Sequence, residues 1–251
     1  MKKRVSKRLV MYEIRNILGN PFIPFFGMAF PLIMLFVIAK AAAQETPESM
    51  ISQVNTAVFI SISMIIPMAV LLIGYAANYS LELEKGIPMR MKLFGFEENT
   101  ILAAKIVAQL LVVTVGLVIY TAVSYALLDM DIPKLWPAVC LVLCLYILSL
   151  IFIVFSHGVA NLMRKFGPTY AVTMGLYFGI MILCGMMGIK TDQLPGILRK
   201  IAYMLPMTYI GNDFITFWQG GSYNFAPLIQ AFLLLGAVSG IILLLSRRKR
   251  G

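Results

Sequence analysis

Between two long apolar runs the chain reads Ser80-Leu-Glu82-Leu-Glu84-Lys85-Gly86-Ile87-Pro88-Met89-Arg90-Met91-Lys92-Leu93-Phe94-Gly95. The apolar runs on either side cover residues 54–79 and 101–128. A loop that only reverses the chain needs no more than a few turn-forming residues. This one carries acidic residues, then a Gly-x-Pro start to a helix, then apolar residues interleaved with basic ones. We therefore expect a short helix between two membrane spans, with a surface that contacts another molecule.

The composition places the chain among integral membrane proteins. Of its 251 residues, 60% are hydrophobic and 13% are charged, and the mean hydropathy is +0.88. Soluble domains carry about a quarter charged residues. The net charge of +10 lies mostly at the ends of apolar runs, which is typical of membrane topology and does not indicate nucleic-acid binding. Because the three cysteines lie inside apolar runs without metal-ligand spacing, neither a metal site nor a disulfide framework is expected.

Six apolar runs are long enough to cross a bilayer, which takes about 20 residues in a helix. They cover residues 21–42, 54–79, 101–128, 135–160, 168–189 and 225–246. The sequence therefore predicts an all-α membrane protein with six transmembrane helices. Pro24, Pro31 and Pro67 mark expected kinks in the first two spans. The Gly-x-x-x-Gly patterns at Gly175 and Gly236 permit close helix packing, within the subunit or across a dimer, and we expect the packing within one subunit.

The distribution of basic residues predicts the orientation. With the N-terminus inside, 16 of the 21 Lys and Arg residues lie in or beside cytosolic segments, and five lie on the outer side. Short loops rich in Lys and Arg stay in the cytosol. Both termini are therefore expected in the cytosol.

Residues 1–20 are assigned to an amphipathic interfacial helix, and residues 21–251 to the six-span domain. The apolar face of the helix is expected to hold Val10, Met11, Ile14, Ile17 and Leu18. Arg8, Arg15 and Asn16 lie opposite, and Gly19-Asn20-Pro21 ends the helix. Such a helix lies along the inner leaflet with its basic side toward anionic lipids. The alternative is an ordinary basic flank that only fixes the topology.

The outer segment 190–224 is too long for a simple turn. It contains two apolar half-helices separated by Pro206, each too short to cross the bilayer. They can dip into the outer leaflet and return if protein or water covers their backbone. We therefore expect a re-entrant helical hairpin before the last span.

Two local patterns resemble those of the permease subunit of type-2 ABC exporters, the ABC-2 family. The first is Glu82-x-Glu84-x-Gly86 with a short helix after it and Lys105 opening the third span, which is similar to the family's coupling helix. The second is Leu194-Pro195 followed by Leu205-Pro206-Met-Thr208-Tyr209, which is similar to the family's segment after the fifth span. The resemblance covers essentially the whole chain.

The resemblance implies a transport subunit that is not itself an enzyme. ATP and Mg²⁺ would bind to a separate cytosolic ATPase, and this chain would bind no cofactor. The sequence agrees, because it has no Gly-x-x-x-x-Gly-Lys-Ser/Thr phosphate loop. The other implied partners are a second permease subunit, identical or related, and membrane lipids. The location would be a plasma membrane, in a bacterium.

The segment 81–95 is the expected contact with the ATPase. Pro88 suits a first helical turn and Gly95 a C-terminal stop. The acids are expected near the start of this helix, where its dipole favours negative charge. The expected coupling residues are Glu82, Glu84, Gly86, Pro88, Met89, Arg90, Met91, Lys92, Leu93 and Phe94. In the re-entrant segment the singled-out residues are Pro195, Pro206, Thr208 and Tyr209. The alternative for segment 81–95 is an amphipathic loop resting on the inner leaflet.

The expected cargo is amphipathic or hydrophobic, namely bacteriocin- or toxin-like peptides ahead of drugs. Uncharged spans disfavour an ion-coupled secondary transporter. A membrane-embedded enzyme is also disfavoured, because the sequence shows no nucleophile–base or metal cluster in a shared layer. Export of lipid-linked polysaccharide stays open, since 12% of the residues are aromatic. His157 is expected to make a helix-packing hydrogen bond, with a proton relay as the alternative. Five methionines near the outer end of the fifth span line the cargo route or simply fill space.

Overall fold

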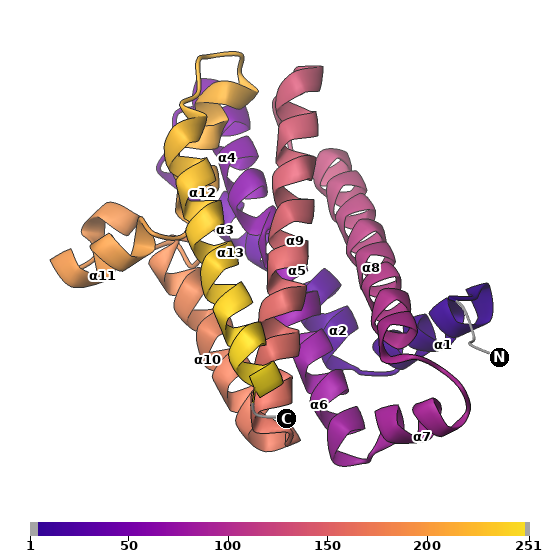
Figure 1. Cartoon of the computed structure of the whole chain (residues 1–251). Coiled ribbons are helices and arrows are strands. Elements are labelled where there is room, and N and C mark those ends of the chain that lie inside the picture. Colours follow the sequence, from indigo (N-terminus) through magenta and orange to yellow (C-terminus); the bar gives the residue numbers. More distant parts are fainter. Residues whose placement is uncertain (1–4, 249–251) are drawn as a thin grey trace.

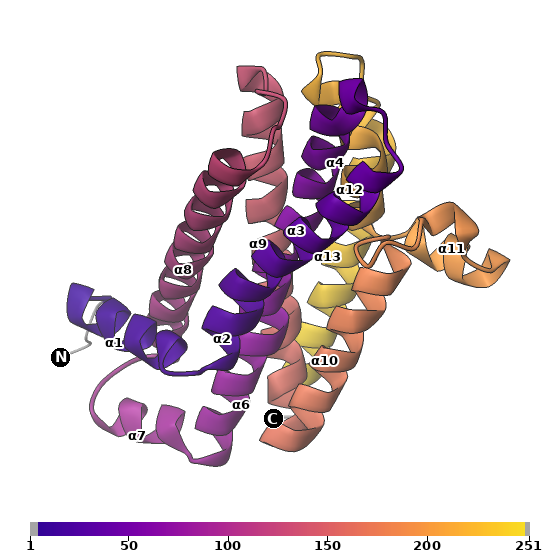
Figure 2. The same ribbon diagram turned by 180° about the vertical axis from the view of Figure 1, so that it is seen from behind.

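The computed structural model describes residues 5–248, which form helices and no β-strand. Six of the helices are long and apolar enough to cross a membrane, and they stand side by side in one bundle (Figures 1 and 2). The predicted all-α fold with six spans is therefore confirmed. The parts of the predicted domains at residues 1–4 and 249–251, with their basic side chains, lie outside the described residues.

The spans agree with the apolar runs to within a few residues, except at the ends of the second and fifth. The first comprises α2 (Phe22–Pro24), η1 (Phe25–Ala29) and α3 (Phe30–Gln44). The second comprises η2 (Glu48–Met50), α4 (Ile51–Ser63), α5 (Ile65–Met68), η3 (Ala69–Tyr75) and α6 (Ala76–Glu84). The others are α8 (Glu98–Leu127), α9 (Leu135–Met163), α10 (Phe166–Leu183) and α13 (Phe225–Arg248). Outside the spans lie α1 (Lys7–Leu18), α7 (Ile87–Leu93), η4 (Thr191–Gln193), α11 (Gly196–Ala202) and α12 (Pro206–Trp218).

The second span forms the centre of the bundle. Every residue from 64 to 77 is buried, whereas the other spans bury one face. This stretch is apolar on all sides, and a helix of that kind is stable only when neighbours surround it. The span runs for 37 residues. At 1.5 Å per residue that is about 55 Å, so it extends well beyond a bilayer core of about 30 Å. Its last turn therefore carries interior contacts out to the segment that follows it.

The first two spans are irregular where the sequence has proline. The π-helical turn η1 lies between Pro24 and Pro31, and η3 begins two residues after Pro67. A proline removes one helical donor and crowds the preceding turn, so the hydrogen bonds shift their register. These turns occur at the expected positions.

Close packing by glycine occurs elsewhere than the Gly-x-x-x-Gly patterns suggest. A Cβ on Gly158 of α9 would lie 3.0 Å from Leu243 N in α13, so the two backbones touch there. At Gly175 and Gly179 a Cβ would meet nothing within 4 Å. The expectation that this pair packs within the subunit is therefore wrong, because none of the described residues lies within 4 Å of a Cβ at either position.

Both described ends of the chain lie at the end of the bundle that holds α7, which we call the α7 end (Figure 1). An even number of spans requires this arrangement. That the α7 end faces the cytosol stays a prediction from the basic residues. The helix α10 stops at Leu183, at mid-height of the bundle, and α11 projects sideways there. The helix α12 then runs toward the end opposite α7 and packs against α4 (Figures 1 and 2). That this segment re-enters the membrane also stays a prediction.

Candidate functional site

The helix α7 begins and ends at glycines with left-handed backbone. Gly86 has φ 67° and lets the chain turn sharply out of α6. Pro88 is the second residue of α7, where no helical donor is needed. At the other end Gly95 has φ 83°, and the amides of Gly95 and Phe96 donate to the carbonyls of Lys92 and Met91 at 2.9 and 3.1 Å. This pattern is a Schellman ending, so the sequence defines both ends of α7.

The exposed side chains of α7 are apolar and basic. Met89 is 68% exposed, Leu93 83% and Phe94 72%. Met89 and Leu93 are four residues apart and so share one helical face. Arg90 and Lys92 are exposed beside them. Met91 is half-buried, because residues two apart in a helix point in different directions. The exposed apolar surface, which we call the α7 face, therefore consists of Met89, Leu93 and Phe94.

From the sequence we expect Glu82 and Glu84 near the N-terminus of α7, and the structure shows that this expectation is wrong. The helix α6 continues through Glu84, so both acids belong to its last turn, and the αL residue Gly86 separates them from α7. Glu84 Oε2 instead accepts a hydrogen bond of 2.9 Å from the amide of Phe166, the first residue of α10. The expected stabilisation at a helix N-terminus is present, but the helix is α10.

Glu82 belongs to a buried ionic cluster that joins three helices. Lys105 Nζ of α8 lies 2.7 Å from Glu82 Oε1 of α6 and 2.7 Å from Glu13 Oε2 of α1. Asn16 of α1 also donates to Glu82 Oε1 at 2.8 Å. The exposed fractions of Glu13, Glu82 and Lys105 are 2%, 5% and 4%. One turn of each helix is therefore held to the other two directly beside the start of α7.

The cluster holds one lysine for two carboxyl groups. With all three ionised it carries one excess negative charge in a buried position, which is costly. Glu13 Oε1 is buried and has no hydrogen-bond partner among the described residues. Burial raises the pKa of the Glu13 carboxyl, and the attraction of Lys105 opposes this shift. Because Glu13 belongs to α1, we expect the contact between α1 and the bundle to depend on pH.

An aromatic layer continues from the cluster into the bundle. The rings of Tyr79 and His157 stack with centroids 4.6 Å apart, and Lys105 Nζ lies 6.0 Å from the Tyr79 ring. His157 Nδ1 and the hydroxyl of Tyr75 are 2.8 Å apart. The hydrogen bond joins α9 to the second span, as expected of a packing histidine.

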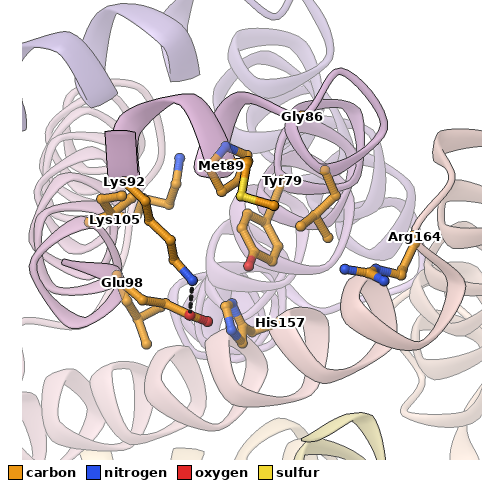
Figure 3. Close-up of a pocket in the computed structure, with 12 residues that line it drawn as sticks. Tyr79, Gly86, Met89, Lys92, Glu98, Lys105, His157 and Arg164 are labelled. Carbon is orange, nitrogen blue, oxygen red and sulfur yellow. Dashed lines mark hydrogen bonds and ion pairs between the residues drawn. The ribbon is translucent and has the colours of Figure 1, made fainter. Parts of the chain in front are cut away.

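A pocket of about 480 Å³ lies between α7 and the bundle (Figure 3). Its walls come from the last turns of α6 and α9, from α7 and from the start of α8. It is lined by Tyr79, Leu83, Gly86, Pro88, Met89, Lys92, Glu98, Ile101, Leu102, Lys105, His157 and Arg164. Lys92 spans part of it to reach Glu98 at 2.8 Å. The pocket thus shares residues with α7, the ionic cluster and the aromatic layer.

The Leu-Pro segments on either side of α11 have a clear structural role. Pro195 precedes α11, and Pro206 is the first residue of α12. Thr208 Oγ1 donates to the Ala202 carbonyl at 2.6 Å, and the Tyr209 hydroxyl donates to the Tyr203 carbonyl at 2.8 Å. These bonds fix the turn from α11 to α12. They lie at mid-height of the bundle, away from α7, and do not form part of the site beside α7 (Figure 1).

The sequence alone does not reveal the ionic cluster. Lys105 is expected to open the third span, whereas it lies about two turns inside α8. Glu13 was not singled out, although it stands four residues from both Leu9 and Ile17, the two apolar residues buried with it. An acid in the middle of an apolar helical stripe was the available signal. Among residues 5–248, no group of three or more His, Cys, Asp or Glu side chains could hold a metal ion.

A comparison with family models decides the class of protein. The sequence matches the family described as ABC-2 type transporter over residues 5–216. The chain belongs to the ABC-2 type transporter family. It is accordingly an ABC permease subunit, a multi-pass membrane protein with a transport role that is not itself catalytic. The ABC-2 match includes α1, α7 and the ionic cluster, and the last span α13 follows it. A search of curated proteins finds no match to the chain.

Proposed function

We propose that this chain is the permease subunit of an ATP-driven exporter that moves amphipathic or hydrophobic substrates out of the cell. The substrates are peptides such as bacteriocins or toxins, or drugs. A separate cytosolic ATPase, which binds ATP and Mg²⁺, docks on α7. The observation that carries this proposal is the α7 face, an apolar surface at the tip of a helix that no other part of the described chain covers.

The chemistry of the α7 face indicates how the ATPase binds. An amphipathic helix lays its apolar face into a hydrophobic groove of its partner, and charges at the rim set the register. Here Met89, Leu93 and Phe94 supply the apolar contact, and Arg90 and Lys92 supply the rim. The groove on the ATPase is therefore apolar with acidic residues at its edge.

The ionic cluster supports transmission from α7 to the spans. A push on α7 acts on the last turn of α6 through the short Lys85–Gly86 connection. Glu82 in that turn is bound to α8 and, through the same lysine, to α1. The three helices therefore move as one unit when α7 moves, rather than α7 bending alone.

The placement of charge supports an amphipathic or apolar cargo. The charged residues that the structure buries are Glu13, Glu82 and Lys105, and all three lie at the α7 end. The rest of the described spans offers no buried ion partner of the kind that ion-coupled transporters use. The methionines contribute less than we expected. Met181, Met186 and Met207 are fully buried in packing, which leaves Met187 and Met204 at the surface.

A second permease subunit completes the proposed exporter. Between α10 and α13 lies an open groove of about 370 Å³ whose lining is almost wholly apolar. Gly175 and Gly179 form part of its wall and let another backbone approach closely. A helix of the second subunit fits this groove, with the cargo route between the two chains.

Reconstitution in proteoliposomes tests the proposal. The chain and its ATPase together are expected to move an amphipathic fluorescent peptide when ATP is supplied, and the chain alone is expected to move none. Transport by the chain alone in response to a proton gradient would contradict the proposal. Selective transport of a lipid-linked oligosaccharide in place of the peptide would retain the exporter and change its cargo.

A further inference from the structure

The pocket beneath α7 has a chemistry that the proposed function does not use. It combines cationic side chains with apolar ones, and its lining residues lie at the α7 end of the bundle. A volume of about 480 Å³ falls within the range of small-molecule sites. This is many times the volume that one water molecule occupies in the liquid, which is about 30 Å³. Its size and mixed lining indicate a ligand with both an anionic and an apolar part.

Arg164 is the cation in this pocket that lacks a carboxylate partner among the described residues. Lys92 is paired with Glu98, and Lys105 with the two acids of the ionic cluster. Arg164 extends from the end of α9 into the pocket, toward Tyr79 and His157 (Figure 3). A guanidinium in this position can donate two parallel hydrogen bonds to one phosphate or carboxylate group.

The backbone at Arg164 strengthens the assignment. Its φ is 54°, and it is the one described residue other than glycine with a positive φ. This C-terminal position of a helix is usually taken by Gly or Asn, because a larger side chain costs about 1 kcal/mol there. The chain places an arginine at this unfavourable position, where its side chain lines the pocket.

The apolar part of the pocket leads toward the membrane. Leu83 comes from α6, and Ile101 and Leu102 come from the first turns of α8. In both views α8 and α9 diverge toward the α7 end, and the pocket lies where they have separated (Figures 1 and 2). A ligand held by Arg164 can therefore extend an apolar tail along α8 into the surrounding lipid.

We propose that this pocket binds the phosphate head group of an anionic phospholipid from the leaflet at the α7 end. Arg164 holds the phosphate, Tyr79 and His157 form the wall beneath it, and the first part of the acyl region lies against Ile101 and Leu102. Since Met89 and Lys92 of α7 line the same pocket, the bound lipid also contacts α7. The lipid braces α7 against the bundle, independently of whether an ATPase is bound.

Native mass spectrometry of the purified full chain in detergent tests this proposal. The probes are phosphatidylglycerol and phosphatidylcholine with the same acyl chains, and glycerol phosphate as a competitor without a tail. We expect one phosphatidylglycerol per chain, retained in preference to phosphatidylcholine. Arg164→Asn keeps a residue that tolerates the left-handed conformation, and it should weaken phosphatidylglycerol binding by about tenfold or more, as expected for a charge-assisted hydrogen bond. Arg164→Lys should retain part of the preference.

Two further variants make the result specific. Lys165→Asn removes an exposed cation next in sequence that does not line the pocket, so it should leave phosphatidylglycerol binding unchanged. Met89→Glu places an acid in the wall opposite and should weaken binding as Arg164→Asn does. Equal retention of the two lipids by the wild type, or equal losses in Arg164→Asn and Lys165→Asn, would overturn the proposal. Displacement by glycerol phosphate at the concentration of the lipid would assign the pocket to a free anion instead. Because no ATPase is present, the result does not depend on the proposed function.

Discussion

Lys105 Nζ lies 2.7 Å from Glu82 Oε1, so α8 is tied to the last turn of α6 at the point where the chain turns into α7. The same ammonium group binds Glu13 of α1. In the proposed exporter these bonds carry a movement of α7 into the spans. A single substitution in this cluster should therefore lower the free energy of unfolding strongly.

Replacement of Lys105 by methionine is expected to destabilise the protein by about 3–5 kcal/mol, because it leaves two buried carboxyl groups without a counter-charge. The matched control is Lys92→Met, which removes an ion pair whose side chains are 48% and 45% exposed. Exposed pairs contribute at most about 1 kcal/mol, so this variant should remain near wild type. Unfolding of both variants in detergent measures the difference.

A triple variant separates charge from packing. With Glu13→Gln and Glu82→Gln added to Lys105→Met, no uncompensated charge remains, and most of the lost stability should return. A triple variant as unstable as Lys105→Met would mean that the shape of the lysine, and not its charge, holds the three helices together.

The attachment of α1 is expected to weaken as the pH rises. Burial raises the pKa of Glu13 above the ordinary 4.5 of a glutamate carboxyl, so the folded state binds this proton more tightly than the unfolded state does. The resulting stabilisation is complete below pH 4.5 and is lost as the pH rises through the raised pKa. Hydrogen exchange of the α1 amides, corrected for the intrinsic pH effect, measures this change. Glu13→Gln should abolish the pH dependence, and an unchanged profile in that variant would assign it to another group.

Gly86 is expected to control the formation of α7 through its backbone alone. A Cβ at this position would meet nothing within 4 Å, so only the φ of 67° opposes a larger residue. Gly86→Ala should destabilise α7 by about 1 kcal/mol, which raises the hydrogen-exchange rate of the α7 amides roughly fivefold. Gly86→Asn should cost less, because asparagine tolerates the left-handed region. Equal effects of the two substitutions would contradict this explanation.

Two glycines on neighbouring spans should respond oppositely to the same substitution. Gly158→Ala forces a Cβ to within 3.0 Å of Leu243 N and 3.1 Å of Ile242 C, so α9 and α13 must separate and the midpoint of unfolding should fall. Gly175→Ala meets open space within the single chain and should be neutral or slightly stabilising, since alanine favours the helix. Thermal unfolding of the two variants, as monomers in detergent, tests the packing of the bundle.

The sequence predicts the spans well because length and hydropathy alone determine them. It also predicts the ends of α7, where Gly86, Pro88 and Gly95 each impose a local backbone geometry. The sequence could not show that Glu82 and Glu84 belong to the preceding helix, because the point at which α6 stops depends on its packing. Glu84 finds its partner, the Phe166 amide, 82 positions along the chain.

Three other features of the structure also differ from what the sequence indicates. Glu13 and Lys105 are 92 residues apart, and a single sequence contains no signal that joins them. The Gly175 and Gly179 pair has the spacing of a packing motif, but the spacing does not say which helix, or which chain, approaches it. Met89, Met91 and Leu93 alternate as if on one strand, whereas the helix turns Met91 away from the other two.

Site-specific cross-linking tests the docking of an ATPase on α7 most directly. A photoreactive phenylalanine derivative replaces Leu93 in one variant and Ile132 in another, since these apolar residues are 83% and 87% exposed. Leu93 is the last residue of α7, and Ile132 lies in the connection from α8 to α9, at the opposite end of the bundle (Figure 1). After irradiation of the cells that produce the chain, mass spectrometry identifies the partner. We expect a cross-link from position 93, and none from position 132, to a protein that carries a Gly-x-x-x-x-Gly-Lys-Ser/Thr loop. A transport-competent chain that forms no such cross-link at position 93, or that forms it at position 132, would contradict the docking of an ATPase on α7.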